Sequence, residues 1–279
     1  MSDVDWAALR ELIERARESD GAAPFNDQAL IEAERDEREV ILRAHAAAIV
    51  SSSAALPEIE FVVDPGHRGN GIGASMLRDL DQRFPHFSAW AHGDHPASRA
   101  LAARFGLSPV RTLLQLEAPV VPGQCSSEVR AFTDADAQTW VSANAAAFAE
   151  HSEQGKLTLD DFNERRRSGW FSPESLMFVH APKGTAGLTS SEDAGVGGFA
   201  WLKDESPESE EIELYAIGVL PEMQGHGLGR VLMNAAFARA HELGKTTMTL
   251  YVEGDNTAAL ALYRSQGFKD FQKDVRYER

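Results

Sequence analysis

The sequence contains a single cysteine, Cys125, among its 279 residues. No internal disulfide can form, which favours a reducing compartment, and we expect the protein to be cytoplasmic. Cys125 lies in the segment VVPGQCSSE, where no charged partner is fixed beside it. An incidental thiol is therefore a better interpretation of Cys125 than a catalytic nucleophile.

Positive charge is also scarce, because 27 Lys and Arg residues stand against 43 Asp and Glu residues and give a net charge of -16. Nucleic acid is held by clustered cations, so this balance argues against a nucleic-acid partner. No apolar run approaches the ~20 residues of a membrane span, and residues 1–21 predict a capped amphipathic helix rather than a signal peptide. We expect a monomer that binds small molecules and no membrane.

The sequence does contain an internal repeat. Residues 63–73 and 219–229 share V-x-P followed by three alternating glycines, at an offset of 156, and residues 95–107 match residues 256–268 at an offset of 161. Two matched blocks in the same order predict a duplicated domain. We expect an N-terminal domain over 1–117, a linker over 118–128 rich in Pro, Gly and Ser, and a C-terminal domain over 129–279.

Hydrophobic periodicity predicts that each half is an α/β domain, with a mixed sheet flanked by helices. In the second half we expect strands at 129–132, 175–181, 196–202, 210–219, 246–252 and 268–277, and helices at 134–149, 158–168, 227–243 and 256–266. In the first half we expect strands at 58–63, 87–91 and 109–117 and helices at 71–83 and 96–105, preceded by a helix at 5–19 and a strand near 39–51.

The glycine-rich loops predict a phosphate site. A loop that enters a helix presents backbone N–H groups without carbonyl partners, the helix dipole adds positive charge, and glycine lets an anion approach closely. The spacing G-x-G-x-G excludes the dinucleotide fingerprint G-x-G-x-x-G, and no G-K-[ST] follows as in a nucleotide-binding loop. The pattern that fits is Q/R-x-x-G-x-G, met by QGHGLG at 224–229 and by RGNGIG at 68–73.

This pattern resembles the acyl-CoA loop of the GNAT family of N-acetyltransferases. DNTAALALYRSQGF, residues 255–268, is similar to the second signature of that family, in which an Asn opens a helix that carries a Tyr and ends in Gly-Phe. The resemblance implies two tandem GNAT-like domains and acetyl-CoA as the acyl donor, with no metal. Within the family it extends along nearly the whole chain to tandem members whose acceptor is the cysteine amine of a cysteinyl-glucosaminyl-inositol.

The resemblance also implies which residues hold acetyl-CoA. In the second half they are Ile217, Gly218, Val219, Gln224, Gly225, His226, Gly227, Leu228, Gly229, Arg230, Asn256, Thr257, Ala258, Ala259, Leu260 and Ala261. In the first half they are Phe61, Val62, Val63, Gly69, Asn70, Gly71, Ile72, Gly73 and Ala74.

Only the second half has proton-transfer groups at the matched positions. Glu213 corresponds to Pro57 and Tyr263 to Ala102, and neither proline nor alanine can act as base or acid. The resemblance implies that Glu213 is the general base, acting through a water, and that Tyr263 is the general acid. We therefore expect the first domain to bind acetyl-CoA without catalysing transfer.

For the acceptor, the resemblance implies Asp27, Glu153, Lys203, Glu213 and Tyr251. Two other interpretations fit the same loops. The chain could acetylate a different amine, such as a peptide N-terminus or an aminoglycoside, or it could be an acyl-CoA sensor without catalytic activity. Glu213 and Tyr263 argue against the sensor.

Overall fold

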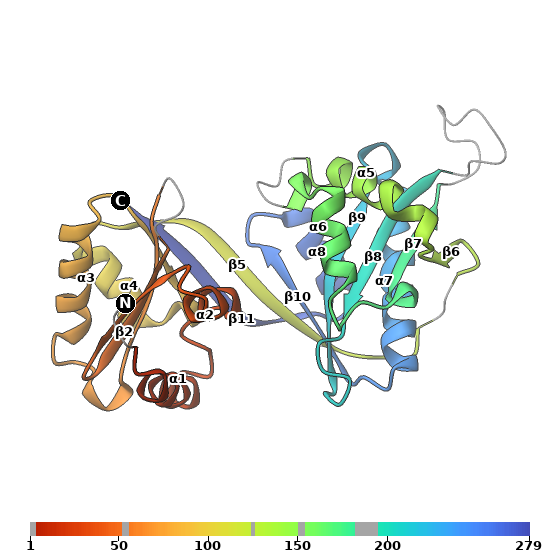
Figure 1. Ribbon diagram of the computed structural model, residues 1–279. Coiled ribbons are helices and arrows are strands. Elements are labelled where there is room, and N and C mark those ends of the chain that lie inside the picture. The colour runs from red at the N-terminus through yellow and green to blue at the C-terminus, as the bar shows by residue number, and fades with distance from the viewer. Residues whose placement is uncertain (1–3, 52–55, 124–125, 150–153, 182–194) are drawn as a thin grey trace. The chain divides into compact units, whose positions relative to one another are not determined.

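The computed structural model describes residues 4–51, 56–123, 126–149, 154–181 and 195–279, which form two compact units (Figure 1). The first unit comprises residues 1–114 together with 253–255 and 271–279, and the second comprises 115–252 together with 256–270. Each unit is a mixed sheet with helices, so the predicted α/β class is confirmed.

The first unit contains most of the N-terminal half and one strand from the end of the chain. Its elements are α1 (Trp6–Asp20), α2 (Asp27–Glu34), β1 (Glu39–Arg43), β2 (Ala46–Ser51), β3 (Glu58–Val63), α3 (Ile72–Arg83), β4 (Ser88–Ala91), α4 (Pro96–Arg104) and most of β11 (Lys269–Glu278). The strand order is β1-β2-β3-β4-β11. The pair β3–β4 is parallel, whereas β1–β2, β2–β3 and β4–β11 are antiparallel.

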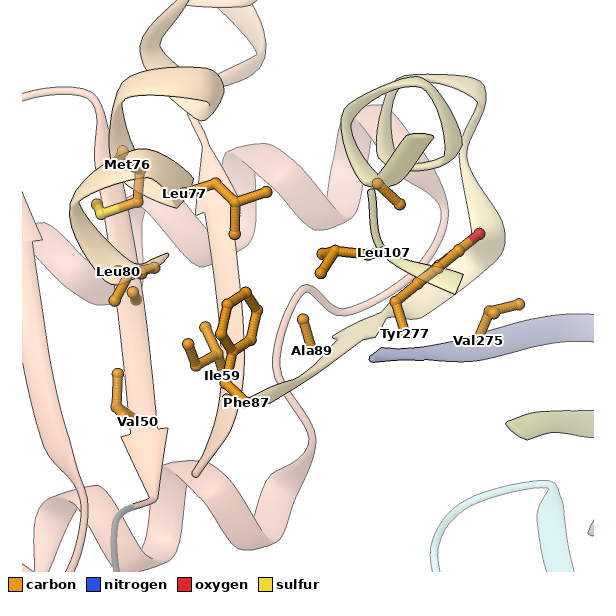
Figure 2. Packing of buried hydrophobic residues seen from close by; sticks show 13 residues of the cluster. Val50, Ile59, Met76, Leu77, Leu80, Phe87, Ala89, Leu107, Val275 and Tyr277 are labelled. Carbon is orange, nitrogen blue, oxygen red and sulfur yellow. The ribbon is translucent and has the colours of Figure 1, made fainter. Parts of the chain in front are cut away.

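Strand β2 shows why helices cover both faces of this sheet. Its side chains point alternately to opposite faces. Ala46, Ala48 and Val50 pack with α3 and α4, while Ala47 and Ile49 pack with α1 and α2. Figure 2 shows the first of these clusters, in which the closing strand β11 contributes Val275 and Tyr277.

The second unit has the strand order β10-β9-β8-β7-β6. Its elements are β6 (Val129–Ala131), α5 (Ala137–Ala147), α6 (Leu159–Arg166), β7 (Leu176–His180), β8 (Val196–Lys203), β9 (Glu211–Val219), α7 (Leu228–Glu242), β10 (Thr247–Glu253) and α8 (Thr257–Ser265). An aromatic core of Trp140, Phe162, Phe199 and Trp201 joins α5 and α6 to β8. Strand β5 (Ser108–Pro119) gives its first part to the first unit and its last five residues to the second.

Two features near the N-terminus differ from the expectation. The region near 39–51 is not one strand, because β1 and β2 form an antiparallel hairpin in which Arg43 pairs with Ala46. Residues 27–34 form α2, which was not predicted, and the side chain of Asn26 caps that helix by accepting the N–H of Ala29 at 2.8 Å. The turn at residues 44–45 contains no Gly, Pro, Asn or Asp to mark it, so the segment looked like one continuous strand.

Candidate functional site

The two glycine-rich loops have the same backbone geometry. Gly69 and Gly71 have φ of 79° and 80°, and Gly225 and Gly227 have φ of 80° and 79°. Residues with a Cβ rarely adopt this left-handed conformation, whereas glycine does so without strain. Gly71 and Gly227 are the residues that directly precede α3 and α7, so each loop delivers the chain to a helix N-terminus.

A side chain at the start of each loop fastens it to the preceding strand. Arg68 donates from Nε to the carbonyl of Val63 at 3.1 Å, and Gln224 donates from Nε2 to the carbonyl of Val219 at 3.5 Å. Both bonds reach back five residues. The matched sequence positions thus make matched contacts, even though one residue is charged and the other is neutral.

The loops leave backbone donors available. Among the described residues, the N–H groups of 69–73 and 225–229 are not among the donors to backbone carbonyls in turns, loops and caps. Each run of amides lies at a helix N-terminus, where the helix dipole favours an anion. This geometry fits the diphosphate of a coenzyme.

The parallel strands beside each loop separate before the loop is reached. In the second unit β9 and β10 pair from Glu211 as far as Glu213, which lies opposite Thr249, whereas β9 continues to Val219. In the first unit β3 and β4 pair as far as Glu60, and β3 continues to Val63. The part of β9 beyond Glu213, which includes Ile217, Gly218 and Val219, can pair with an extended ligand as with an added strand.

A cavity of about 380 Å³ lies in the first unit. It is lined by eight of the nine residues predicted to hold the coenzyme there, namely Phe61, Val62, Val63, Gly69, Gly71, Ile72, Gly73 and Ala74. Asn70 instead donates from Nδ2 to the carbonyl of His67 at 3.2 Å. Tyr277 of β11 also lines the cavity, so the end of the chain contributes to it.

Glu213 lies at the end of the paired part of β9, next to a lysine. Its Oε2 is 3.7 Å from Nζ of Lys203, the residue opposite it on β8, and a quarter of its side chain is exposed. Lys203 also forms an ion pair of 2.7 Å with Glu205. Burial raises the pKa of Glu213, the charge of Lys203 opposes this rise, and the charge of Glu205 adds to it. Glu213 is thus tuned toward accepting a proton.

Tyr263 lies on α8 and is 7% exposed. Its ring packs against Phe268, with 5.9 Å between the ring centroids. Burial raises the pKa of Tyr263 to about 12, so its hydroxyl keeps its proton at neutral pH and can donate it.

Asn256 is the N-cap of α8, and its side chain accepts the N–H of Ala259 at 3.1 Å. The residues from Thr257 to Ala261 form the first turns of that helix. His226 turns back on its own loop, with Nδ1 3.0 Å from the carbonyl oxygen of Gln224. Leu228, Gly229 and Arg230 begin α7, where Leu228 is buried.

The residues predicted to bind the acceptor are divided between the units. Lys203, Glu213 and Tyr251 belong to neighbouring strands of the second unit, where Tyr251 is 49% exposed on β10. Asp27 is exposed in the first turn of α2 in the first unit. Glu153, like Cys125, lies outside the described residues.

An aromatic wall beside Lys203 was not anticipated from the sequence. The ring centroid of Trp170 is 5.5 Å from that of Tyr215 and 5.7 Å from Nζ of Lys203. Arg165 on α6 donates from Nε to the hydroxyl of Tyr215 at 2.9 Å. Trp170 follows α6 in an irregular segment, so no periodicity marked it as a neighbour of β8.

The first unit has a different charged centre at the corresponding strands. His92 lies between Asp274 of β11 and Glu60 of β3, at 2.8 Å and 2.9 Å respectively. Burial alone would lower the pKa of His92, but the two carboxylates raise it to about 9. His92 is therefore a charged, fully paired group, unlike Glu213.

One group of described residues has the composition of a metal site: His45, Asp64 and His67 in the first unit. Asp64, however, already accepts two hydrogen bonds from Arg15, at 3.0 Å and 3.2 Å. The rings of His45 and His67 are stacked, with centroids 3.6 Å apart. This donor set fits a divalent cation poorly, because Arg15 neutralises its only carboxylate.

Comparisons with known proteins agree with this geometry. Residues 143–268 match the model of the Acetyltransferase (GNAT) family. The chain is 40% identical to a protein named mycothiol acetyltransferase from Clavibacter sepedonicus, over 96% of this chain and 90% of that protein. It is 36% identical to a protein of the same name from Kocuria rhizophila, over 96% of this chain and 94% of that protein.

Solved structures show the same fold. A GCN5-related N-acetyltransferase from Sphaerobacter thermophilus superposes with a TM-score of 0.70 at 18% identity, covering 98% of this chain and 91% of that one. A tandem GNAT protein from the clavulanic acid biosynthesis pathway superposes with a TM-score of 0.65 at 15% identity, covering 98% and 94%. No helix within the described residues has both the length and the apolar character needed to traverse a bilayer.

Proposed function

Since the chain belongs to the GNAT family of acetyltransferases and matches mycothiol acetyltransferases along almost its whole length, we propose that it acetylates the cysteine amine of a cysteinyl-glucosaminyl-inositol. The second unit is the catalytic one in this proposal. The observation that carries it is the position of Glu213, whose carboxylate lies where β9 and β10 begin to separate and whose pKa is raised.

Acetyl-CoA supplies the activated acyl group. The amides of residues 225–229 bind its diphosphate, and the unpaired edge of Ile217, Gly218 and Val219 holds its extended arm. One N–H of this edge donates to the thioester carbonyl oxygen, where negative charge develops. The two left-handed glycines and the hydrogen bond from Gln224 to Val219 support this assignment, because they fix the loop relative to the strand.

The reaction needs one proton removed and one delivered. An α-amino group has a pKa of about 7.7–8.0, so a carboxylate with a raised pKa can take the proton of the attacking amine through a water. Glu213 performs this step. The hydroxyl of Tyr263 gives a proton to the departing sulfur, and its high pKa ensures that it is protonated beforehand.

The acceptor carries hydroxyl groups and a sugar ring. Lys203, Tyr251 and Glu153 provide polar contacts to it in this proposal, and Asp27 is a further candidate. Trp170 and Tyr215 offer an aromatic surface beside Lys203, which suits the apolar face of a sugar ring.

The N-terminal domain binds acetyl-CoA without turning it over. Its cavity is lined by residues at the start of α3 and the end of β3, which supports this role. Pro57 and Ala102 stand where the second half has its base and its acid, and His92 is held between two carboxylates. The full protein acts as a cytoplasmic monomer in this proposal.

Free-thiol release from acetyl-CoA tests the function. We expect release with the cysteinyl amino-sugar inositol, and much less with cysteine, a peptide N-terminus or an aminoglycoside. Release only with the peptide or the aminoglycoside would identify a different N-acetyltransferase. Binding of acetyl-CoA without release for any amine would identify a sensor. The amount of acetyl-CoA bound per chain, measured by calorimetry, tests the first domain and should be two.

A further inference from the structure

The ammonium group of Lys203 is near two carboxylates but lies closer to one of them. Its Nζ is 2.7 Å from Oε1 of Glu205 and 3.7 Å from Oε2 of Glu213. The ammonium therefore makes a direct contact with Glu205 and a looser one with Glu213. Only 19% of the lysine side chain is exposed, against 61% of that of Glu205, so the closer partner approaches from the solvent side.

The fold limits where this lysine can go. Lys203 ends β8 directly opposite Glu213, so the backbone places the two side chains on one face of the sheet. The centroid of the Trp170 ring lies 5.7 Å from Nζ. Glu205 follows two residues later, beyond the end of the strand. Removal of Glu205 would thus permit the ammonium to move toward Glu213.

Within the described part of the chain, Lys203 and Glu205 are the charged groups that influence Glu213. Strand β10 presents the uncharged Thr249 opposite it. Tyr215 and Tyr251 are the titratable side chains that follow along β9 and β10. Glu205 affects the pKa of Glu213 in two ways, and both raise it. Glu205 binds the ammonium of Lys203, and it adds a second negative charge.

We infer that Glu205 is a positioning residue for the base: it holds the ammonium of Lys203 away from Glu213 and so leaves that carboxylate able to take a proton. This inference rests on the proposed role of Glu213. Without Glu205, the lysine would form a close ion pair with Glu213, which stabilises the charged carboxylate and makes it a poorer base. Glu205 does not touch the reacting atoms.

The kinetic test compares Glu205→Gln with Glu208→Gln, an exposed glutamate three residues further on that provides the same charge change. In Glu205→Gln the acidic limb of the profile of kcat/KM against pH should move down by roughly half to one pH unit, and the plateau should fall severalfold. Glu208→Gln should match the wild type, and Glu205→Asp should restore part of the shift. Superimposable profiles for Glu205→Gln and Glu208→Gln, together with an unchanged titration midpoint of Glu213, would overturn the inference.

A direct titration separates this inference from the proposed function. The carboxyl carbon of Glu213 is followed by NMR against pH in the wild type and in Glu205→Gln, with Glu213→Gln used to assign its signal. A lower midpoint in Glu205→Gln supports the inference, and an unchanged midpoint refutes it. A lowered midpoint with an unchanged rate profile would support the effect of Glu205 but refute Glu213 as the base.

Discussion

Each unit has the same glycine-rich loop after an equivalent strand, β3 or β9. The parallel neighbour of that strand separates from it at a different position in each unit. In the second unit the last paired residue, Glu213, is six positions before Val219, whereas in the first the last paired residue, Glu60, is three before Val63. The longer opening ends at a half-buried carboxylate with a raised pKa. The shorter one ends near a charged histidine, His92, which pairs with two carboxylates. Under the proposed function, coenzyme binding and proton transfer are therefore separable properties of this fold.

The largest effect should come from Glu213→Gln, which removes the base and keeps the size of the side chain. We expect kcat/KM to fall by about 10²–10⁴-fold, with acetyl-CoA binding unchanged in calorimetry. Glu211→Gln, on the same strand and exposed, provides the control and should retain wild-type turnover. Wild-type turnover in Glu213→Gln would remove the main chemical difference between the units.

A smaller loss should follow Tyr263→Phe. Without the hydroxyl the departing thiolate must take its proton from water, so we expect kcat to fall by about 10²-fold. Tyr277→Phe is the matched control, because it deletes a buried tyrosine hydroxyl from the first unit. If Tyr263→Phe behaves like Tyr277→Phe at every pH, Tyr263 is not the acid.

The charged centre of the first unit should make its stability depend on pH. The folded pKa of His92, about 9, is above its ordinary value of 6.5, so the protonated ring stabilises the fold. This stabilisation is complete below pH ~6.5 and is lost as the pH rises through about 9.

Urea unfolding followed by fluorescence between pH 6 and 10 measures this effect, which we expect to be roughly a few kcal/mol. His92→Gln should be less stable at pH 6 and should lose most of the dependence. His86→Gln, at an exposed position, should keep it. A flat stability profile in the wild type would contradict the pairing of His92 with Asp274 and Glu60.

The smallest effects should come from the matched glycines. Alanine at a left-handed position costs ~1–2 kcal/mol, so Gly227→Ala should raise KM for acetyl-CoA about five- to thirtyfold. Gly71→Ala should leave KM and kcat unchanged and instead weaken the second binding event seen in calorimetry. Loss of turnover in Gly71→Ala would mean that the first unit is needed for catalysis.

The conformation of the loops could be predicted from the sequence because it depends on the backbone. Glycines at fixed spacing and an Asn before a helix report backbone geometry directly, and Gly225, Gly227 and Asn256 have the expected conformations or contacts. The correspondence of Glu213 with Pro57 was likewise visible from the offset between the halves.

Long-range pairing could not be predicted in the same way. The strands 109–117 and 268–277 occupy equivalent places in the repeat, so periodicity does not say which sheet each one completes. Glu205 was equally hidden, because it lies in the acidic segment DESPESEE, which is typical of a solvated loop. Its importance depends on a contact of 2.7 Å with Lys203 that only the folded chain shows.

The pairing of β11 with β4 has a consequence for biosynthesis. Arg276 and Tyr277 lie opposite Trp90 and Ala89, although more than 180 residues separate them along the chain. During translation the sheet of the first unit cannot be completed until β11 has left the ribosome. Until then the edge of β4 lacks this partner, and an unpaired strand edge in a nascent chain favours wrong pairing.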